Sequence, residues 1–306
     1  MAINNIMRIF NFILLYFLCI SYINAQKKFD FDTTVIVGKD KQIYQQRQIE
    51  IDSNKNIYVA SFFKGSLTIG NTTLTTNSPL NYFTSQAIFL AKYDSNMQFQ
   101  WLKKVAESDT LNNFSFDIDM NGNFLFSMLY RGKIYYENDS INSVGDFDIL
   151  LLNYGNNFNF KHKNVIGNFN GEGISDNSIA FDKYGNYYLC GWFNSTWAGN
   201  YSNYKLGINN DTLVANNADL FIAKFDSTGV GIWAKSYGGS GIDALSTIFY
   251  YDDNLYFMGG LGASNNNNIG GIIVNYPLNY YNNCFISKLD SSGNGLWVKK
   301  NLEVLI

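Results

Sequence analysis

Few side chains in this chain are suited to catalysis, and its single histidine comes first among them. His162 is the only histidine in 306 residues, so a metal site built from several histidines is impossible. A Ser-His-Asp triad would have to use this residue, and no G-x-S-x-G nucleophile motif accompanies it. His162 also stands where the other copies of a repeat carry tryptophan, so we expect it to pack rather than to catalyse. No catalytic residue is predicted.

Two turns resemble the opening of a calcium-binding loop. Asp52–Asn56 and Asp119–Asn123 both read D-x-N-x-N, but neither is followed by the glycine of such a loop. Their twelfth positions are Phe63 and Tyr130, where the loop needs glutamate. We therefore interpret both segments as turns in which the aspartate accepts hydrogen bonds from nearby backbone N–H groups. The sequence predicts no metal and no cofactor.

One loop combines aromatic rings with amide and hydroxyl side chains. The stretch 191–204 reads GWFNSTWAGNYSNY and carries the candidate ligand-binding residues Trp192, Trp197, Tyr201 and Tyr204. Amphipathic rings beside amides suit a recognition surface, and stacking on a sugar would be one use of them. The alternative is that these rings pack on the edges of their own strands.

His162 lies in a hairpin that occurs four times in the chain. Asp219–Gly238 is the clearest copy, with an apolar strand, an Asp-Ser-Thr-Gly turn and a second apolar strand. The pattern recurs at Phe285–Lys299, at Ile88–Lys103 and, most weakly, at Ile149–Lys163. In the weakest copy, His162 replaces the tryptophan.

A second signature precedes each hairpin and sets the period. An apolar strand, a turn close to D-x-x-G-N and an aromatic strand recur about every 65 residues, with the asparagines at Asn56, Asn123, Asn186 and Asn254. Each repeat offers four strand-like runs, and no helical periodicity follows the N-terminal leader. Four strands at this period are typical of a β-propeller blade. The predicted fold is therefore all-β, a β-propeller within 47–306 with blades at 47–106, 114–167, 176–238 and 243–301.

The repeat resembles a known family. The motifs D-x-x-G-N-x-Y, DLFIAKFDSTG followed by W-A-K, and Y-G-G-S-G-I-D are best preserved over Asp182–Asp252. They are similar to the SBBP β-propeller repeats of secreted bacterial proteins. The resemblance covers nearly all of the chain after the leader and implies a propeller, without implying an activity.

The number of repeats departs from that family. Its propellers are expected to have more than four blades, so three alternatives stay open: an incomplete propeller, a truncated reading frame and an arc completed by another polypeptide. A four-bladed ring is also a known architecture. The N-terminal segment 26–46 contains the run Thr33–Val37, which we expect to offer a closing strand to the fourth sheet.

The first 25 residues are interpreted as a secretory signal peptide. Arg8 provides the positive charge, Ile9–Ile20 the short apolar core, and cleavage is expected after Ala25. A membrane anchor and a lipidated Cys19 are the alternatives, but the apolar run is shorter than the roughly 20 residues of a spanning helix. The mature chain is expected to be secreted or at the cell surface, without a transmembrane segment.

Charge and cysteine content limit the partners of the chain. The formal net charge is −3 and no basic cluster could neutralise several phosphates, so nucleic acid is a poor partner. Cys190 and Cys284 remain after removal of the leader. Buried free thiols are the default for them, and a disulfide is the alternative.

These features together predict a secreted β-propeller scaffold that binds a protein or a glycan without catalysis. The alternative is a secreted carbohydrate-active enzyme, a glycosidase or a lyase, with carboxylates near the propeller axis. Two carboxylates facing each other about 5–9 Å apart across a pocket would favour the enzyme.

Overall fold

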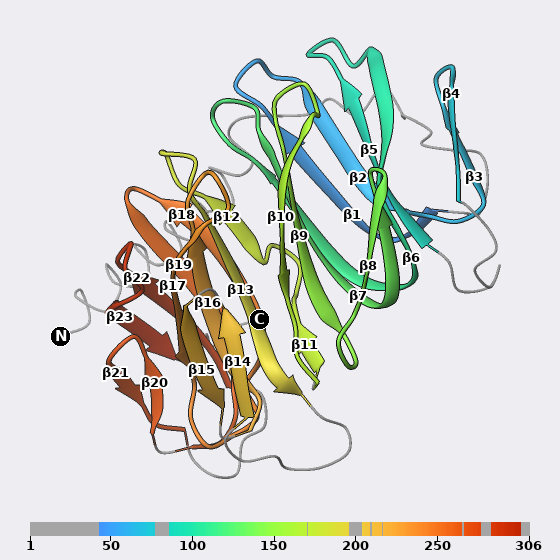
Figure 1. Ribbon diagram of the computed structural model, residues 1–306. Coiled ribbons are helices and arrows are strands. Elements are labelled where there is room, and N and C mark those ends of the chain that lie inside the picture. The colour runs from blue at the N-terminus through green and yellow to red at the C-terminus, as the bar shows by residue number, and fades with distance from the viewer. Residues whose placement is uncertain are drawn as a thin grey trace, which may run out of the picture. The chain divides into compact units, whose positions relative to one another are not determined.

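A computed structural model shows how the strands of the chain are arranged (Figure 1). It describes residues 43–300 apart from 77–85, 170, 196–203, 209, 216, 265 and 277–282. The leader and the run Thr33–Val37 lie outside this part, so the signal peptide and the closing strand stay predictions. Every regular secondary-structure element of this described part is a β-strand, which confirms the all-β class. No helix of the described part is long and apolar enough to cross a membrane.

The N-terminal half forms one antiparallel sheet of eight strands. Its spatial order is β1 (Ile43–Ile51), β2 (Ile57–Phe63), β5 (Gln86–Tyr93), β6 (Phe99–Ile118), β7 (Phe124–Tyr136), β9 (Asp148–Tyr154) and β10 (Phe160–Ile166), with β8 (Asp139–Asn142) paired to β7. β6 is 20 residues long and pairs with β5 through its first half and with β7 through its second. The first two repeats therefore share one strand, where the sequence placed them in separate blades.

The C-terminal half forms two further antiparallel sheets. The first contains β11 (Gly171–Gly173), β12 (Ile179–Phe181), β13 (Tyr187–Ser195), β16 (Asp219–Phe225) and β17 (Gly231–Tyr237). The second contains β18 (Ala244–Tyr251), β19 (Asn254–Leu261), β22 (Asn283–Leu289) and β23 (Gly295–Lys300). Short hairpins follow the second strand of three repeats: β3 (Ser66–Ile69) with β4 (Thr72–Thr75), β14 (Tyr204–Ile208) with β15 (Asp211–Ala215), and β20 (Asn267–Ile269) with β21 (Ile272–Val274).

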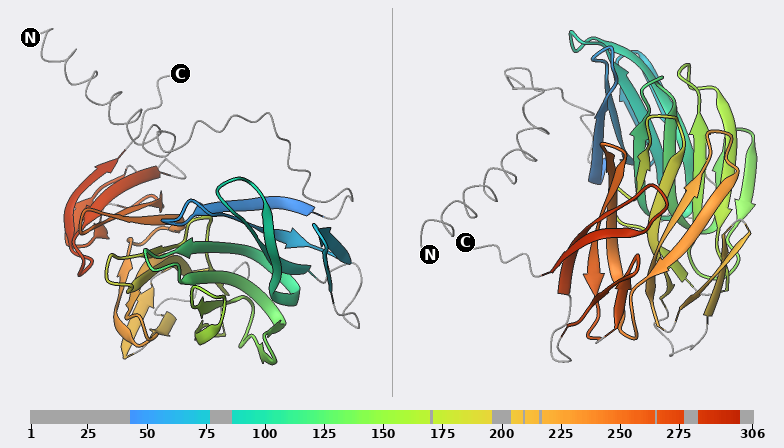
Figure 2. Two further views of the ribbon diagram at one scale, coloured as in Figure 1. Left: turned by 90° about the horizontal axis from the view of Figure 1, so that it is seen from above. Right: turned by 90° about the vertical axis from the view of Figure 1, so that its left-hand side faces the viewer.

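Four modules of four strands each follow one another along the chain. Module 1 is β1, β2, β5 and the first half of β6; module 2 is the second half of β6 with β7, β9 and β10; module 3 is β12, β13, β16 and β17; module 4 is β18, β19, β22 and β23. In Figures 1 and 2 they succeed each other from blue through green and yellow to red.

Strand pairing aligns the modules residue by residue. One line of paired positions, here called the cross-strand row, runs through the second, third and fourth strands of each module. The rows are Tyr58–Lys92–Trp101, Leu125–Asn153–His162, Tyr188–Lys224–Trp233 and Tyr256–Lys288–Trp297. Lysine lies over the tyrosine ring in three rows, at 5.4, 4.9 and 5.7 Å from the centroid, a cation–π arrangement. Module 2 alone departs from this pattern.

Three clusters of buried side chains connect consecutive modules. The first joins modules 1 and 2 around Phe62 and Phe114, whose rings meet edge to face at 4.9 Å. The second joins modules 2 and 3, and the third joins modules 3 and 4. Each fully buried aromatic or aliphatic side chain contributes about 1.5–3 kcal/mol. Among the described residues no such cluster joins module 4 to module 1.

The aspartate turns expected from the sequence are confirmed. Asp52 Oδ1 accepts the backbone N–H groups of Asn54 and Asn56, each at 2.9 Å, and its Oδ2 accepts the Asn56 amide at 2.7 Å. Asp119 and Asp182 make the same bonds to the residues two and four positions on. Each carboxylate thus satisfies backbone donors of a strand-to-strand turn. No cluster of described residues has the composition of a metal site.

Candidate functional site

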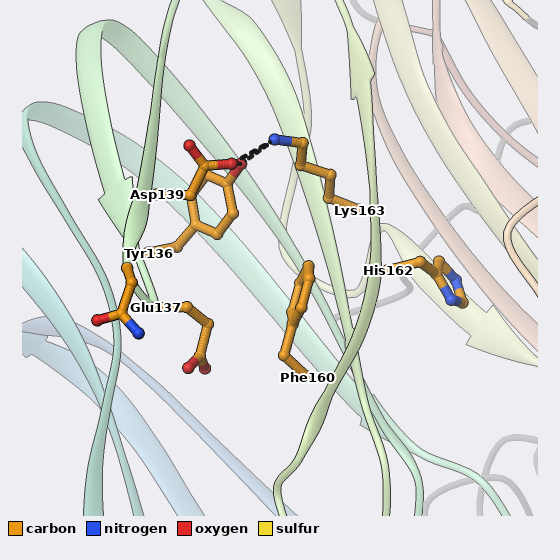
Figure 3. Close-up of a pocket in the computed structure, with 7 residues that line it drawn as sticks. Tyr136, Glu137, Asp139, Phe160, His162 and Lys163 are labelled. Carbon is orange, nitrogen blue, oxygen red and sulfur yellow. Dashed lines mark hydrogen bonds and ion pairs between the residues drawn. The ribbon is translucent and has the colours of Figure 1, made fainter.

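The candidate site is a cavity of about 580 Å³ on module 2 (Figure 3). Its lining comes from the end of β7, from the turn that leads into β8, from the first residue of β8, and from β10. The lining residues are Tyr136, Glu137, Asn138, Asp139, Phe160, His162 and Lys163. The volume falls within the range of small-molecule sites.

A charged network forms one wall of this cavity. Lys163 Nζ donates to Asp139 Oδ2 at 2.8 Å and makes a short hydrogen bond to the Tyr136 hydroxyl. That hydroxyl in turn donates to Asp139 Oδ2 at 2.8 Å, as Figure 3 illustrates by the closeness of the three groups. The hydrogen bonds from Lys163, Tyr136 and the Ser140 backbone lower the pKa of Asp139 to about 2. Hydrogen bonds to Asp139 and then to the Tyr136 hydroxyl raise the pKa of Lys163, so this lysine is a fixed positive charge and not a nucleophile.

Lys163 occupies a position that is apolar in every other module. The strand register places it where modules 1, 3 and 4 carry Leu102, Ala234 and Val298. Those three side chains are buried or pack against a buried cluster. The lysine instead reaches toward the β7–β8 turn, which brings its partner Asp139 from 24 residues earlier in the chain.

Two aromatic rings form the apolar part of the cavity. Phe160 is 39% exposed, and its ring centroid lies 6.2 Å from that of Tyr136 and 5.8 Å from that of Tyr154. Lys163 Nζ lies 5.0 Å from the centroid of the Tyr136 ring. Phe160 therefore packs against two buried tyrosine rings, and the rest of its ring is exposed to solvent.

His162 packs against module 3, which confirms the role expected from the sequence. Its ring stacks on that of Tyr187 at 6.1 Å, and Nε2 lies 3.2 Å from the Tyr187 hydroxyl. A Cβ on Gly229 would come within 2.4 Å of the imidazole, so this glycine makes room for it. Burial, followed by the charge of Lys161, lowers the pKa of His162. The imidazole is therefore neutral at pH 7.

Glu137 gives the cavity its net charge. It is an exposed turn residue with a φ of 47°, and it lines the cavity together with Phe160 (Figure 3). After burial, its charge is the next cause that raises the pKa of Tyr154. No ion pair joins Glu137 to a cation among the described residues. Since Lys163 offsets only Asp139 and His162 is neutral, the lining carries one uncompensated negative charge.

The aromatic residues singled out in the sequence lie elsewhere. Trp192 is in β13 and packs against the cluster between modules 3 and 4, with its indole close to Gly173. Tyr204 begins β14, while Trp197 and Tyr201 lie outside the described residues. Trp192 does not line the cavity of module 2, and ligand binding by the four residues stays a prediction.

A pair of carboxyl groups does occur in the molecule, on the first strands of modules 1 and 2. Burial and the charge of Asp117 raise the pKa of Glu50 to about 8, and burial raises that of Asp117 to about 6. Asp117 Oδ2 accepts the Phe181 N–H at 2.9 Å and Oδ1 accepts the Ile118 N–H at 2.8 Å. Asp117 thus links β6 to β12, and its oxygens are occupied by backbone donors. The two cysteines of the described residues, Cys190 and Cys284, are free; Cys190 is buried, but Cys284 is exposed, which corrects the expectation that both thiols are buried.

Comparison with known proteins finds similar solved structures, and those described here have low sequence identity to the chain. No protein-family model and no curated protein matches the chain. A glutamate-to-glutamine variant of the Synechocystis apocarotenoid oxygenase aligns with 85% of this chain at 12% identity and a TM-score of 0.42. The cobalt-substituted form of that oxygenase aligns with 85% of the chain at 13% identity and a TM-score of 0.39. This chain spans 50% of the length of each.

These similar structures correct the predicted function. The sequence predicted a non-catalytic scaffold for protein or glycan, with a carbohydrate-active enzyme as the alternative. The solved structures that resemble the chain are of an apocarotenoid oxygenase, which is neither, so those functions are not retained. TM-scores below 0.5 transfer neither the fold nor the activity of the oxygenase to this chain.

Proposed function

We propose that the chain binds a small organic cation with an apolar body in the cavity of module 2. The observation that carries the proposal is that the Glu137 carboxylate and the exposed ring of Phe160 line the same cavity (Figure 3). A carboxylate next to an aromatic face offers an ammonium group both a counter-charge and a π-surface. An anionic ligand would be repelled by the uncompensated negative charge of the same carboxylate.

The remaining lining residues would orient such a ligand. The network of Lys163, Asp139 and Tyr136 is held by hydrogen bonds within the protein, so it offers a rigid polar wall. The exposed ring of Phe160 offers apolar area to the body of the ligand. An exposed cation–π contact contributes about 0.5–1 kcal/mol, and each buried methylene adds about 0.8 kcal/mol. A dissociation constant between roughly 10 µM and 1 mM is expected for a ligand of this size.

The test compares three probes that share one ring and differ in charge. Benzyltrimethylammonium, benzyl alcohol and benzoate are each titrated into the purified mature chain by isothermal titration calorimetry. The expected order of affinity is cation, then neutral alcohol, with benzoate weakest by at least tenfold over the cation. Equal affinity of the cation and benzoate would contradict the proposal, because the charge of Glu137 would then play no part.

We further infer that the four modules are blades of the SBBP type of β-propeller repeat and that the chain is exported. Support comes from the common strand register of the modules and from the hairpin sequence that they share. The leader 1–25 carries the pattern of a cleaved signal. N-terminal sequencing of the secreted chain should begin at Gln26, and retention of Met1 in a cell-associated chain would contradict export.

A further inference from the structure

The three junctions between modules follow one rule. The third residue of each cross-strand row lies against the turn between the third and fourth strands of the next module. The Trp101 ring lies 5.6 Å from that of Phe158, in the turn of module 2. A Cβ on Gly229 would meet His162 at 2.4 Å, and one on Gly293 would meet Trp233 at 2.8 Å.

A polar contact accompanies two of these ring contacts. Asn164, two residues after His162, donates from Nδ2 to the Gly229 carbonyl oxygen at 2.9 Å. Lys235, two residues after Trp233, donates from Nζ to Asn294 Oδ1 at 2.8 Å. Each junction between modules 2, 3 and 4 thus combines one ring against a turn with one side-chain donor to the same turn.

Module 4 presents the same features with no following module among the described residues. The row extends onto β18, where Phe249 pairs with Tyr256 and their rings stack at 4.8 Å with an angle of 4°. Trp297 meets the Tyr256 ring at 6.3 Å, and Lys299 lies two residues further on and is exposed. Phe249 is 42% exposed, although its equivalent in module 3, Ala180, is buried.

Module 1 presents the features that would receive such a row. Its turn 94–98 has the same aspartate bonds as the turns of modules 3 and 4, and Met97 has a φ of 65° in the position of Gly229 and Gly293. Ile49 of β1 is 59% exposed, although its equivalents in the other modules, Phe116, Ile179 and Ile248, are no more than 5% exposed. Ile51, the next residue on this face, is 37% exposed.

We propose that module 4 of one chain docks on module 1 of a second copy of the same chain. Trp297 would lie against Met97 of the second copy, a ring–sulfur contact, and Phe249 against its Ile49. Lys299 would donate to the Gln98 side chain of the second copy. This contact would be equivalent to the one between Lys235 and Asn294 at the junction of modules 3 and 4. The contact repeats the internal junctions, and two such contacts made head to tail close a symmetric dimer of eight modules. The first module of the same chain is not the occupant, because Ile49 and Phe249 are both exposed.

The test measures the mass of the mature chain by size-exclusion chromatography with light scattering. The wild-type chain is expected as a dimer. Phe249→Asp and Ile49→Asp should each give a monomer, while Ile232→Asp, a change at another exposed apolar residue that is 51% exposed, should leave the dimer intact. Circular dichroism shows that each variant is folded.

Mixing the two monomeric variants distinguishes the head-to-tail contact, module 4 on module 1, from a tail-to-tail contact, module 4 on module 4. The Ile49→Asp chain keeps an intact Phe249, and the Phe249→Asp chain keeps an intact Ile49, so one wild-type contact can form and the mixture should yield a dimer. A tail-to-tail dimer would survive Ile49→Asp and would not be restored by mixing. Either of those results, or a wild-type chain that stays monomeric at 100 µM (~10 times a typical working concentration), overturns the proposal.

Discussion

Lys163 on β10 donates to Asp139 at the start of β8, Nζ to Oδ2 at 2.8 Å, from a position that is apolar in the other three modules. The pair marks the module whose sequence departs most from the repeat. In module 2, a lysine replaces the apolar residue that packs in the other modules, and its ion pair forms one wall of the cavity that Phe160 also lines. The candidate site thus lies where the repeat pattern is weakest.

Replacement of Lys163 separates its structural from its binding role. In Lys163→Leu the repeat-like apolar residue returns, and Asp139 becomes a second uncompensated carboxylate in the cavity. We expect a stability change within about 1 kcal/mol, because the ion pair is exposed. Affinity for benzyltrimethylammonium should rise about two- to fivefold as a like charge is removed. A fall in affinity, measured by calorimetry, would show that the ligand needs the lysine.

The glycine turns should be sensitive to a single methyl group. Gly293 has a φ of 78°, and a Cβ there would meet Trp233 at 2.8 Å and the Tyr237 hydroxyl at 2.6 Å. Gly132 has the same φ of 78° with open space around it, so it is a matched control for backbone strain. Gly132→Ala should cost about 1 kcal/mol, and Gly293→Ala about 1–3 kcal/mol more because Trp233 must move. Equal losses in urea unfolding would show that the ring-to-turn contact contributes nothing.

Stability should fall as the pH rises from 5 to 8. Burial raises the pKa of Asp148 and of Asp243 to about 6, and that of Glu50 to about 8. Because these pKa values are higher in the folded state, their contribution is complete below about pH 4. It is lost as the pH rises from there to about 6 for the two aspartates and to about 8 for Glu50. Asp148→Asn removes one such charge and should raise the unfolding free energy at pH 8 by about 1–2 kcal/mol, with a much smaller effect at pH 4. A variant with unchanged pH dependence in thermal unfolding would contradict this assignment.

Aspartates whose pKa is lowered in the folded state make the chain less stable in acid. Hydrogen bonds from its own turn lower the pKa of Asp226, Thr228 being the largest cause, and several such bonds lower that of Asp290. These carboxylates stabilise the folded chain above about pH 4 and lose that contribution as the pH falls through their lowered pKa values. The thermal unfolding temperature should therefore be highest near pH 4–5 and fall on both sides. A maximum above pH 7 would contradict the prediction.

The sequence predicted features that depend on local patterns. The all-β class, the aspartate turns and the packing of His162 follow from strand periodicity, from Asx chemistry and from the tryptophan position that His162 fills. The shared strand β6 was missed because its middle carries polar residues that read as a connection between two blades. The cavity was missed because Lys163 and Asp139 are 24 residues apart and meet only through the β7–β8 turn. The one available signal was a lysine in a position that is otherwise apolar.

The most direct measurement of the central claim is the dissociation constant of benzyltrimethylammonium for Glu137→Gln. The matched control is Asp252→Asn, which removes the same charge from an exposed turn of module 4. Loss of the Glu137 charge from the cavity lining should weaken binding about 5- to 20-fold, while the control should bind within twofold of the wild-type chain. Equal binding by Glu137→Gln and Asp252→Asn would contradict the account.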